Sequence, residues 1–383
     1  MPPRRYHKKS RTGCLACRSR RIKCDETWPV CESCQRAALL CDYRAAGQRS
    51  RAPRPASQSH EPELTEQSRP SEAPASADAP ATFDMLDLSL MHYYTATTSI
   101  SLFGTAQVTI WQQEIPTIAH SSPLLMHGLL ATAALQASSL AGNEGRTYWA
   151  KALHHHNRGL LLFNPLISHI TPASAPILFT FSLLLVVWAY ASTGINATNS
   201  NNNNNNTTSP SLLTLLTSLD LVRGSMALLE SHTDAIMDHP VTRRHLPTTR
   251  WTGRVRDLPA QTASILASLR NKAADVIDSL GIDHLERFLQ EAEESGDDTG
   301  MATGWPATIN GIVWKRVRDG RPLSVLTFMH YAVIVERHCR PCWWLEGWAE
   351  ALVRAVEGVL GEADKERLEW AVHRDWVKFV LGV

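Results

Sequence analysis

The sequence predicts a small cysteine-rich domain over residues 13–43, a disordered linker over 44–82 and an all-α domain over 83–383. Six regularly spaced cysteines mark the first segment. The second is rich in Pro, Ser, Ala, Gln and Glu, and it lacks the apolar residues that would offset the loss of chain entropy on folding. In the third, apolar residues recur every three or four positions and strand signals are scarce, so we expect packed amphipathic helices.

The six cysteines fall into two parallel sets with the spacing C-x2-C-x6-C-x6-C-x2-C-x6-C. A thiolate is a soft ligand that suits Zn²⁺, which takes four donors in a tetrahedron at about 2.3 Å from sulfur. Six thiolates are too few for two separate four-ligand sites, but two bridging cysteines would close the shortfall. We therefore predict a site for two Zn²⁺ ions made by Cys14, Cys17, Cys24, Cys31, Cys34 and Cys41.

Disulfide bonds are the alternative use of an even number of cysteines in a short domain. The chain opens MPPRRYHKKSRTG, which has no apolar core of the kind found in a signal peptide, and basic residues crowd the cysteines. Zinc is favoured because disulfides belong mostly to secreted domains. The segment is too small for a substantial core, so its folding should depend on the metal.

Positive charge is concentrated at the N-terminus, although the whole chain carries a formal net charge of only +1. Residues 1–51 contain 13 Lys and Arg against 4 Asp and Glu, whereas the remainder contains 25 against 33. Residues 1–12 form a basic arm with the run RRYHKKSR, which can serve as a nuclear import signal, as a phosphate-contacting arm or as both. This end of the chain is therefore the part suited to nucleic acid.

The cysteine spacing, the basic run from Arg18 to Lys23 and Pro29 two places before the fourth cysteine resemble the fungal binuclear zinc-cluster transcription factors. The resemblance implies two short helices around two Zn²⁺ ions. It also implies a zinc-dependent regulator of RNA polymerase II genes that works in the nucleus. Its partners would be double-stranded DNA and the transcription machinery or its co-regulators.

The resemblance also assigns the metal ligands. In that family the first and fourth cysteines bridge the two ions, and these correspond to Cys14 and Cys31. Cys17 and Cys24 would then complete one ion. Cys34 and Cys41 would complete the other.

The family reads a CG-containing site in the major groove, and the positions that match its base-reading residues are Arg20 and Arg21. An arginine fork can satisfy O6 and N7 of guanine together, which is worth about 1–3 kcal/mol of base discrimination. We expect Arg21 to make this contact. The remaining cations are predicted to contact phosphates, which set register and affinity without reading sequence: Arg18, Lys23, Lys9 and Arg11.

Two segments of the helical domain need separate interpretation. Ile177 to Val187 is apolar nearly all round but shorter than the roughly 20 residues that a bilayer requires, so we expect a buried central helix and no membrane span. The Asn-rich segment at about 196–210 is predicted to be a disordered loop. Because the linker contains no sustained apolar heptad, a homodimer would have to form through the helical domain.

A second resemblance covers scattered blocks of the helical domain. GWPATINGIVW, RPLSVLTFMHYAVIVERHC, WWLEGWAEALV, RLEWAV and LMHYYTATTSISL resemble the regulatory domain of zinc-cluster regulators of the sterol-uptake-control type. This implies an apolar pocket for a sterol or other lipid that governs nuclear entry, with the ligand-bound protein in the cytoplasm. Large apolar residues that could wall such a pocket, although they are more often ordinary core, are Trp343, Trp344, Phe328 and Tyr331.

Two hypotheses about the helical domain stay open at this point. It either senses a sterol or other lipid, or it is a ligand-free interaction and dimerisation scaffold, as in a regulator of a metabolite gene cluster. The chain contains no G-x-S-x-G, no Walker loop and no H-E-x-x-H, so we expect no enzyme.

Overall fold

The structure is a computed structural model that divides into two compact units, Met1–Glu72 and Ala73–Val383. In the first unit it describes residues 14, 16, 17, 20, 22–25, 27, 31–37 and 41. In the second it describes 83–140, 144–202, 210–245, 257–292, 300–339 and 342–382, without the side chains of 196–202, 245, 300, 301, 338 and 339. The predicted basic arm and linker lie outside these residues.

The N-terminal unit is built from short local elements around its cysteines. A first helical turn includes Ala16, whose carbonyl accepts a hydrogen bond from the N–H of Arg20 at 3.2 Å. Helix α2, Glu32–Arg36, carries Cys34 on its buried side. Asp25 accepts a hydrogen bond from the first N–H of α2 at 3.1 Å, which holds the preceding loop against the start of that helix.

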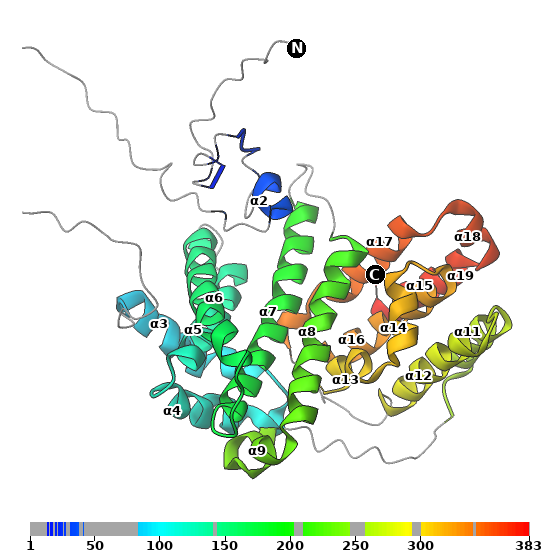
Figure 1. Cartoon of the computed structure of the whole chain (residues 1–383). Coiled ribbons are helices and arrows are strands. Elements are labelled where there is room, and N and C mark those ends of the chain that lie inside the picture. Colours follow the sequence, from blue (N-terminus) through cyan, green and yellow to red (C-terminus); the bar gives the residue numbers. More distant parts are fainter. Residues whose placement is uncertain are drawn as a thin grey trace, which may run out of the picture. The chain divides into compact units, whose positions relative to one another are not determined.

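All regular elements described in the second unit are helices (Figure 1). The first half contains α3 Met85–Ala96, α4 Ile115–Ala119, α5 Pro123–Leu140, α6 Gly145–Ile167, α7 Ala175–Asn202, α8 Leu212–Ser231, α9 Thr233–Asp238 and α10 Pro240–His245. Between α3 and α4 lie 3₁₀ turns at Thr98–Ser101 and Thr105–Gln107 and a π-helical turn at Ile110–Glu114.

The second half of this unit continues the same pattern with shorter helices. They are α11 Ala260–Asn271, α12 Val276–Ala292, α13 Gly300–Thr308, α14 Gly311–Arg318, α15 Pro322–Met329, α16 Tyr331–Cys339, α17 Trp348–Val359, α18 Glu362–Arg367 and α19 Trp370–Leu381. A 3₁₀ turn at Trp343–Leu345 precedes α17. The expectation of an all-α domain is confirmed.

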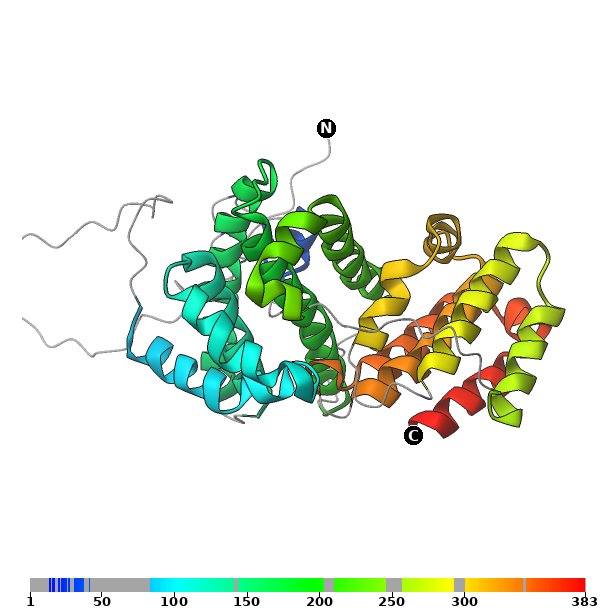
Figure 2. The ribbon, with the colours of Figure 1, turned by 90° about the horizontal axis from the view of Figure 1, so that it is seen from below.

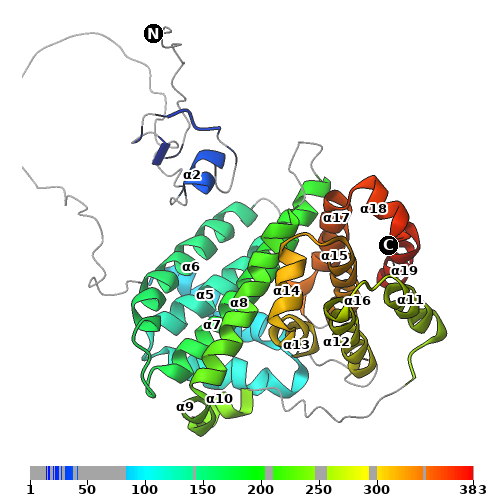
Figure 3. The same cartoon turned by 45° about the vertical axis from the view of Figure 1, so that its right-hand side comes forward.

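Helices α7 and α8 lie side by side at the centre of this unit (Figure 1). Helices α3 to α6 cover one side of the pair, and α11 to α19 cover the other (Figures 2 and 3). The sequence of α7 is apolar around most of its circumference, as expected of a helix that is covered on several sides. Leu178, Phe181, Val187 and Tyr190 are accordingly no more than 1% exposed.

Within the described part of the chain, two helices are long and apolar enough to cross a membrane by length and composition alone, at Ala175–Ile195 and Leu212–Ser231. The first is 78% buried inside the protein and the second 39%. Buried core helices of water-soluble proteins meet the same length and hydropathy criteria, so the finding is weak evidence for a membrane span. The packing of α7 between two layers of helices corresponds to the buried central helix expected from the sequence.

Helix boundaries differ from the sequence-based expectation at several places. Helix α7 continues to Asn202, so the predicted loop does not begin at 196. Once a helix is nucleated each further residue adds a hydrogen bond, and asparagine costs at most about 0.7 kcal/mol. The apolar periodicity of residues 260–279 and of residues 307–318 predicts one helix in each segment, but both of these helices are interrupted. Asp275 and Asn310 accept hydrogen bonds from N–H groups two residues ahead, at 2.9 and 2.8 Å, and so start new helices.

A charge network centred on the buried Asp87 anchors α3, the first helix of this unit, to α5 and α6. Lys151 Nζ lies 2.7 Å from carboxylate oxygens of both Asp84 and Asp87, and His155 Nε2 lies 2.9 Å from Asp87 Oδ1. Because a carboxylate only accepts, His155 Nε2 is the donor. In neutral His155, Nδ1 then accepts a hydrogen bond from His127 Nδ1–H at 2.9 Å. Three helices are thereby joined through one carboxylate.

Asp87→Asn is expected to destabilise the helical unit at pH 7 by about 1–2 kcal/mol and to flatten its pH dependence in acid. Burial raises the pKa of Asp87, but hydrogen bonds from Lys151, from the N–H of Asp84 and from His155 outweigh burial and lower the pKa to about 2. The folded-state pKa lies below the ordinary value of about 3.9, so the stabilisation is present above that pH and is lost as the pH falls towards 2.

Thermal denaturation of the wild type and of Asp87→Asn between about pH 7 and pH 3 measures this effect. Asp364→Asn is the matched control, because Asp364 pairs with Arg367 at 2.7 Å on the exposed surface, where an ion pair contributes little. Parallel pH profiles of the wild type and Asp87→Asn would contradict the anchoring role.

Candidate metal centre and nucleic-acid interface

The six sulfur atoms of the N-terminal unit form two overlapping groups of four. In each group all sulfurs lie within 4.8 Å of one another, and the groups are Cys14, Cys17, Cys24, Cys31 and Cys14, Cys31, Cys34, Cys41. Cys14 and Cys31 belong to both groups, and they are the two cysteines expected to bridge the metals. Five of the six residues are at most 4% exposed, and Cys41 is half-buried. The sulfur atoms, which are soft donors shielded from solvent, therefore surround two positions suited to a metal ion, one in each group.

The distances between these sulfurs fit zinc ligands. A tetrahedron with metal–sulfur bonds of about 2.3 Å has edges of about 3.8 Å. The sulfur of Cys14 lies 3.7 Å from that of Cys31 and 3.5 Å from that of Cys34, and the sulfurs of Cys17 and Cys31 are 3.5 Å apart. A disulfide would bring two sulfurs to about 2.05 Å. The spacing therefore matches shared metal coordination and not disulfide bonds.

Backbone N–H groups and burial set the chemistry of the thiols. The N–H of Cys17 points to Cys14 Sγ at 3.4 Å, and the N–H of Cys31 points to Cys41 Sγ at 3.2 Å. Such contacts favour the thiolate form that a metal needs. In the absence of an ion, burial and then the neighbouring Cys31 raise the pKa of the Cys17 thiol to about 12. Zinc must therefore displace protons as it binds, and acid should weaken its binding.

The predicted DNA-contacting residues are in part described. Arg20 and Lys23 are exposed, and Ile22 between them is 41% exposed while its N–H donates to the carbonyl of Cys17 at 3.1 Å. This short segment therefore presents side chains outward from a backbone that is held to the metal-binding turn. The other predicted contacts lie outside the described residues and stay predictions: Arg18, Arg21, Lys9 and Arg11.

Three of the four candidate pocket residues meet in a buried aromatic cluster. The rings of Phe328 and Tyr331 stack at 6.0 Å between centroids, and the hydroxyl of Tyr331 lies 2.9 Å from that of Tyr190. The ring of Tyr190 contacts Trp344 edge-on at 5.4 Å. These four residues are fully buried, whereas Trp343 is half-buried. Phe328 and Tyr331 thus pack against each other in the core, and Trp344 joins them through Tyr190.

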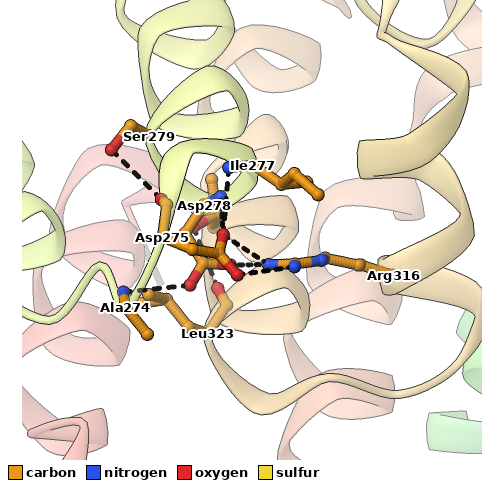
Figure 4. A network of polar contacts seen from close by, with 8 residues as sticks. Ala274, Asp275, Ile277, Asp278, Ser279, Arg316 and Leu323 are labelled. Carbon is orange, nitrogen blue, oxygen red and sulfur yellow. Dashed lines mark hydrogen bonds and ion pairs between the residues drawn. The ribbon is translucent and has the colours of Figure 1, made fainter.

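A cavity of about 10 Å³ lies beside Phe328, which is room for about one water molecule. Asp278 contributes to its lining and pairs with Arg316 at 2.9 Å. Arg316 also binds Asp275 at 2.6 Å, so this network clamps the end of α14 to the start of α12 beside the cavity (Figure 4). A sterol is far larger than this space, so it could enter here only if the aromatic cluster and the clamp opened.

Sequence reasoning did not single out Tyr190 or Trp305, which complete the cluster. Trp305 stacks on Tyr331 at 4.9 Å, and its buried Nε1 has no hydrogen-bond partner among the described atoms. The one signal in the sequence that could have pointed to Tyr190 was its hydroxyl group, which follows the long apolar run that forms α7. That signal alone does not reveal its partner, because Tyr190 and Tyr331 are 141 positions apart in the sequence.

Six thiolates in two four-sulfur groups that share two members are the ligand set of a binuclear zinc cluster, here carried on a chain with a large helical unit. Comparison with known proteins agrees. Residues 12–50 match the family described as the fungal Zn(2)-Cys(6) binuclear cluster domain, which implies two zinc ions. Residues 89–250 match the fungal specific transcription factor domain. Residues 12–50 and 89–250 thus match two families of transcription-factor domains, and neither is a family of enzymes.

Curated relatives cover parts of the chain. The chain is 37% identical over 145 residues to the Zn(2)-C6 fungal-type transcription factor afumD of Aspergillus fumigatus, covering 37% of this chain and 36% of that protein. It is 30% identical over 238 residues to a Zn(2)-C6 fungal-type transcription factor of Gibberella zeae, covering 50% and 48%. Sterol uptake control protein 2 of Candida albicans is 55% identical over 40 residues, covering 10% and 6%. The chain thus spans about half or less of the curated relatives it matches.

Proposed function

We propose that this protein is a zinc-dependent, sequence-specific DNA-binding regulator of RNA polymerase II genes that acts in the nucleus. The observation that carries the proposal is the pair of four-sulfur groups that share Cys14 and Cys31, directly beside an exposed basic segment. Zinc orders this unit because the unit has little other core. The ordered unit presents Arg20 and Arg21 to a CG-containing site, and the helical unit recruits or withholds the transcription machinery.

Arg21→Ala is expected to weaken binding to the matched site by about 1–3 kcal/mol, or roughly 5- to 150-fold, and to relax preference at one guanine. The reason is the loss of a fork that can satisfy O6 and N7 of guanine together. Binding to a matched duplex and to a scrambled duplex of equal length, measured by fluorescence anisotropy at several salt concentrations, gives both affinity and specificity.

Lys9→Ala is the control for this experiment, because a phosphate contact should weaken all duplexes alike and flatten the salt dependence. Zinc content is measured for each variant to show that the cluster is intact. Equal loss at matched and scrambled duplexes for Arg21→Ala would defeat its assignment as a base-reading residue.

For the helical unit we propose an interaction and dimerisation scaffold in preference to a sterol sensor. The supporting observation is the closed aromatic cluster around Tyr331, beside which the cavity measures only about 10 Å³. The sterol hypothesis, with a ligand-bound cytoplasmic state, remains the second candidate because a sterol uptake control protein is among the relatives, over 40 residues.

Native mass spectra of the full chain with and without added sterol distinguish the two candidates for the helical unit. A bound mass in the sterol range that a competitor displaces would establish the sensor. A dimer whose fraction rises with protein concentration, and which binds none of the added sterols, would support the scaffold.

A further inference from the structure

An open groove of about 230 Å³ lies between α3, the end of α5 and the start of α6. Leu90 and Ala137 are buried and supply an apolar base, while Leu140 stands at its edge with 71% of its surface exposed. The volume is far below that of a sterol site but sufficient for a small molecule. This groove shares no lining residue with the cavity beside Phe328.

Two tyrosines line the groove from different helices, Tyr93 from α3 and Tyr148 from α6. Both are half-buried, and neither ring stacks on another aromatic ring within the described part of the chain. Burial, and after it the neighbouring Tyr148 hydroxyl, raise the pKa of Tyr93, which indicates that the two phenols lie close together. Their rings are therefore available to a ligand.

Among the described residues that line the groove, Glu144 is the one that carries a charge. It is exposed at the start of α6, and among the residues that the structure describes it has no ion-pair partner. An anion would be repelled by this carboxylate, and an uncharged ligand would partly desolvate it without pairing it. A cation would be attracted both by the carboxylate and by the electron-rich faces of the aromatic rings.

We propose that this groove binds a small organic ammonium ion, with Glu144 facing the charge and the rings of Tyr93 and Tyr148 contacting its alkyl groups. Alkylated ammonium ions suit such a site because they are weakly hydrated and attracted to aromatic faces. The site lies wholly within the helical unit, so the proposal does not depend on how the zinc cluster binds DNA.

The test uses the full zinc-loaded chain and two probes of nearly the same shape, cationic choline and neutral 3,3-dimethylbutan-1-ol. Isothermal titration calorimetry at constant ionic strength should show choline binding roughly tenfold more tightly than the alcohol. Glu144→Gln should weaken choline by a similar factor. Tyr148→Leu should abolish binding, and Tyr148→Phe, which keeps the ring, should restore it.

Glu230→Gln is the matched control, because Glu230 is an exposed glutamate on α8 and does not line the groove. It should leave choline binding unchanged. Melting temperatures check that each variant is folded, and if Tyr148→Leu is destabilised the surface variant Glu144→Gln decides. Equal affinity for both probes, no loss in Glu144→Gln, or no choline binding up to millimolar concentrations would each overturn the proposal.

Discussion

Cys31→Ser is expected to remove both zinc ions and to abolish DNA binding, whereas Cys41→Ser should keep about one ion. The reason is that the sulfur of Cys31 belongs to both four-sulfur groups, while that of Cys41 belongs to one. Losing a shared ligand leaves each ion with three protein ligands. Structural zinc contributes about 10–16 kcal/mol in small domains, so the loss of both ions should unfold the N-terminal unit.

Zinc content by native mass spectrometry, together with DNA binding, measures this difference. Circular dichroism is the internal control, because each unit has its own core and the helical signal of the second should remain unchanged in both variants. Equal zinc content in Cys31→Ser and Cys41→Ser would contradict the bridging assignment. Removal of metal from the wild type with a strong chelator should reproduce the effect of Cys31→Ser.

The cysteine cluster could be predicted from sequence because its ligands lie close together along the chain. Their spacing therefore indicates which sulfur atoms can reach the same metal ion. The helical fold could be predicted because apolar periodicity is also local. Contacts between distant segments leave no such trace. Trp344 Nε1 donates a hydrogen bond to the carbonyl of Leu102 at 2.6 Å, across 242 positions of sequence. The sequence therefore marked Trp344 as a large apolar residue but could not decide between pocket wall and core.

The helix interruptions at Asp275 and Asn310 could not be predicted from apolar periodicity, for a related reason. The apolar repeat runs through Asp275 and Asn310 without a change of phase, so periodicity alone predicts one continuous helix. The local signal that was available is the capping tendency of Asp and Asn, whose side chains bond the free N–H groups at a helix start. At both positions this local hydrogen bond prevails over the longer periodic pattern.

Gly194→Ala is the second substitution from which we expect a large effect, because α7 approaches the backbone that leads into α17 at this point. A Cβ atom at Gly194 would lie 2.2 Å from the carbonyl oxygen of Glu346, well inside van der Waals contact. Backbone atoms cannot rotate away as a side chain can, so α7 or the turn before Trp348 must shift. We expect the free energy of unfolding to fall by about 1–3 kcal/mol and the melting temperature to fall by roughly 2–10 °C.

Gly224→Ala on α8 separates this contact from the general effect of replacing a glycine in a helix. A Cβ at Gly224 would meet no atom within 4 Å, so the substitution should stabilise the helical unit by about 0.5–1 kcal/mol through helix propensity. Both variants share that gain, and the difference between their melting temperatures therefore reports the steric cost at Gly194. If both variants were stabilised alike, α7 would not approach Glu346 as closely as described.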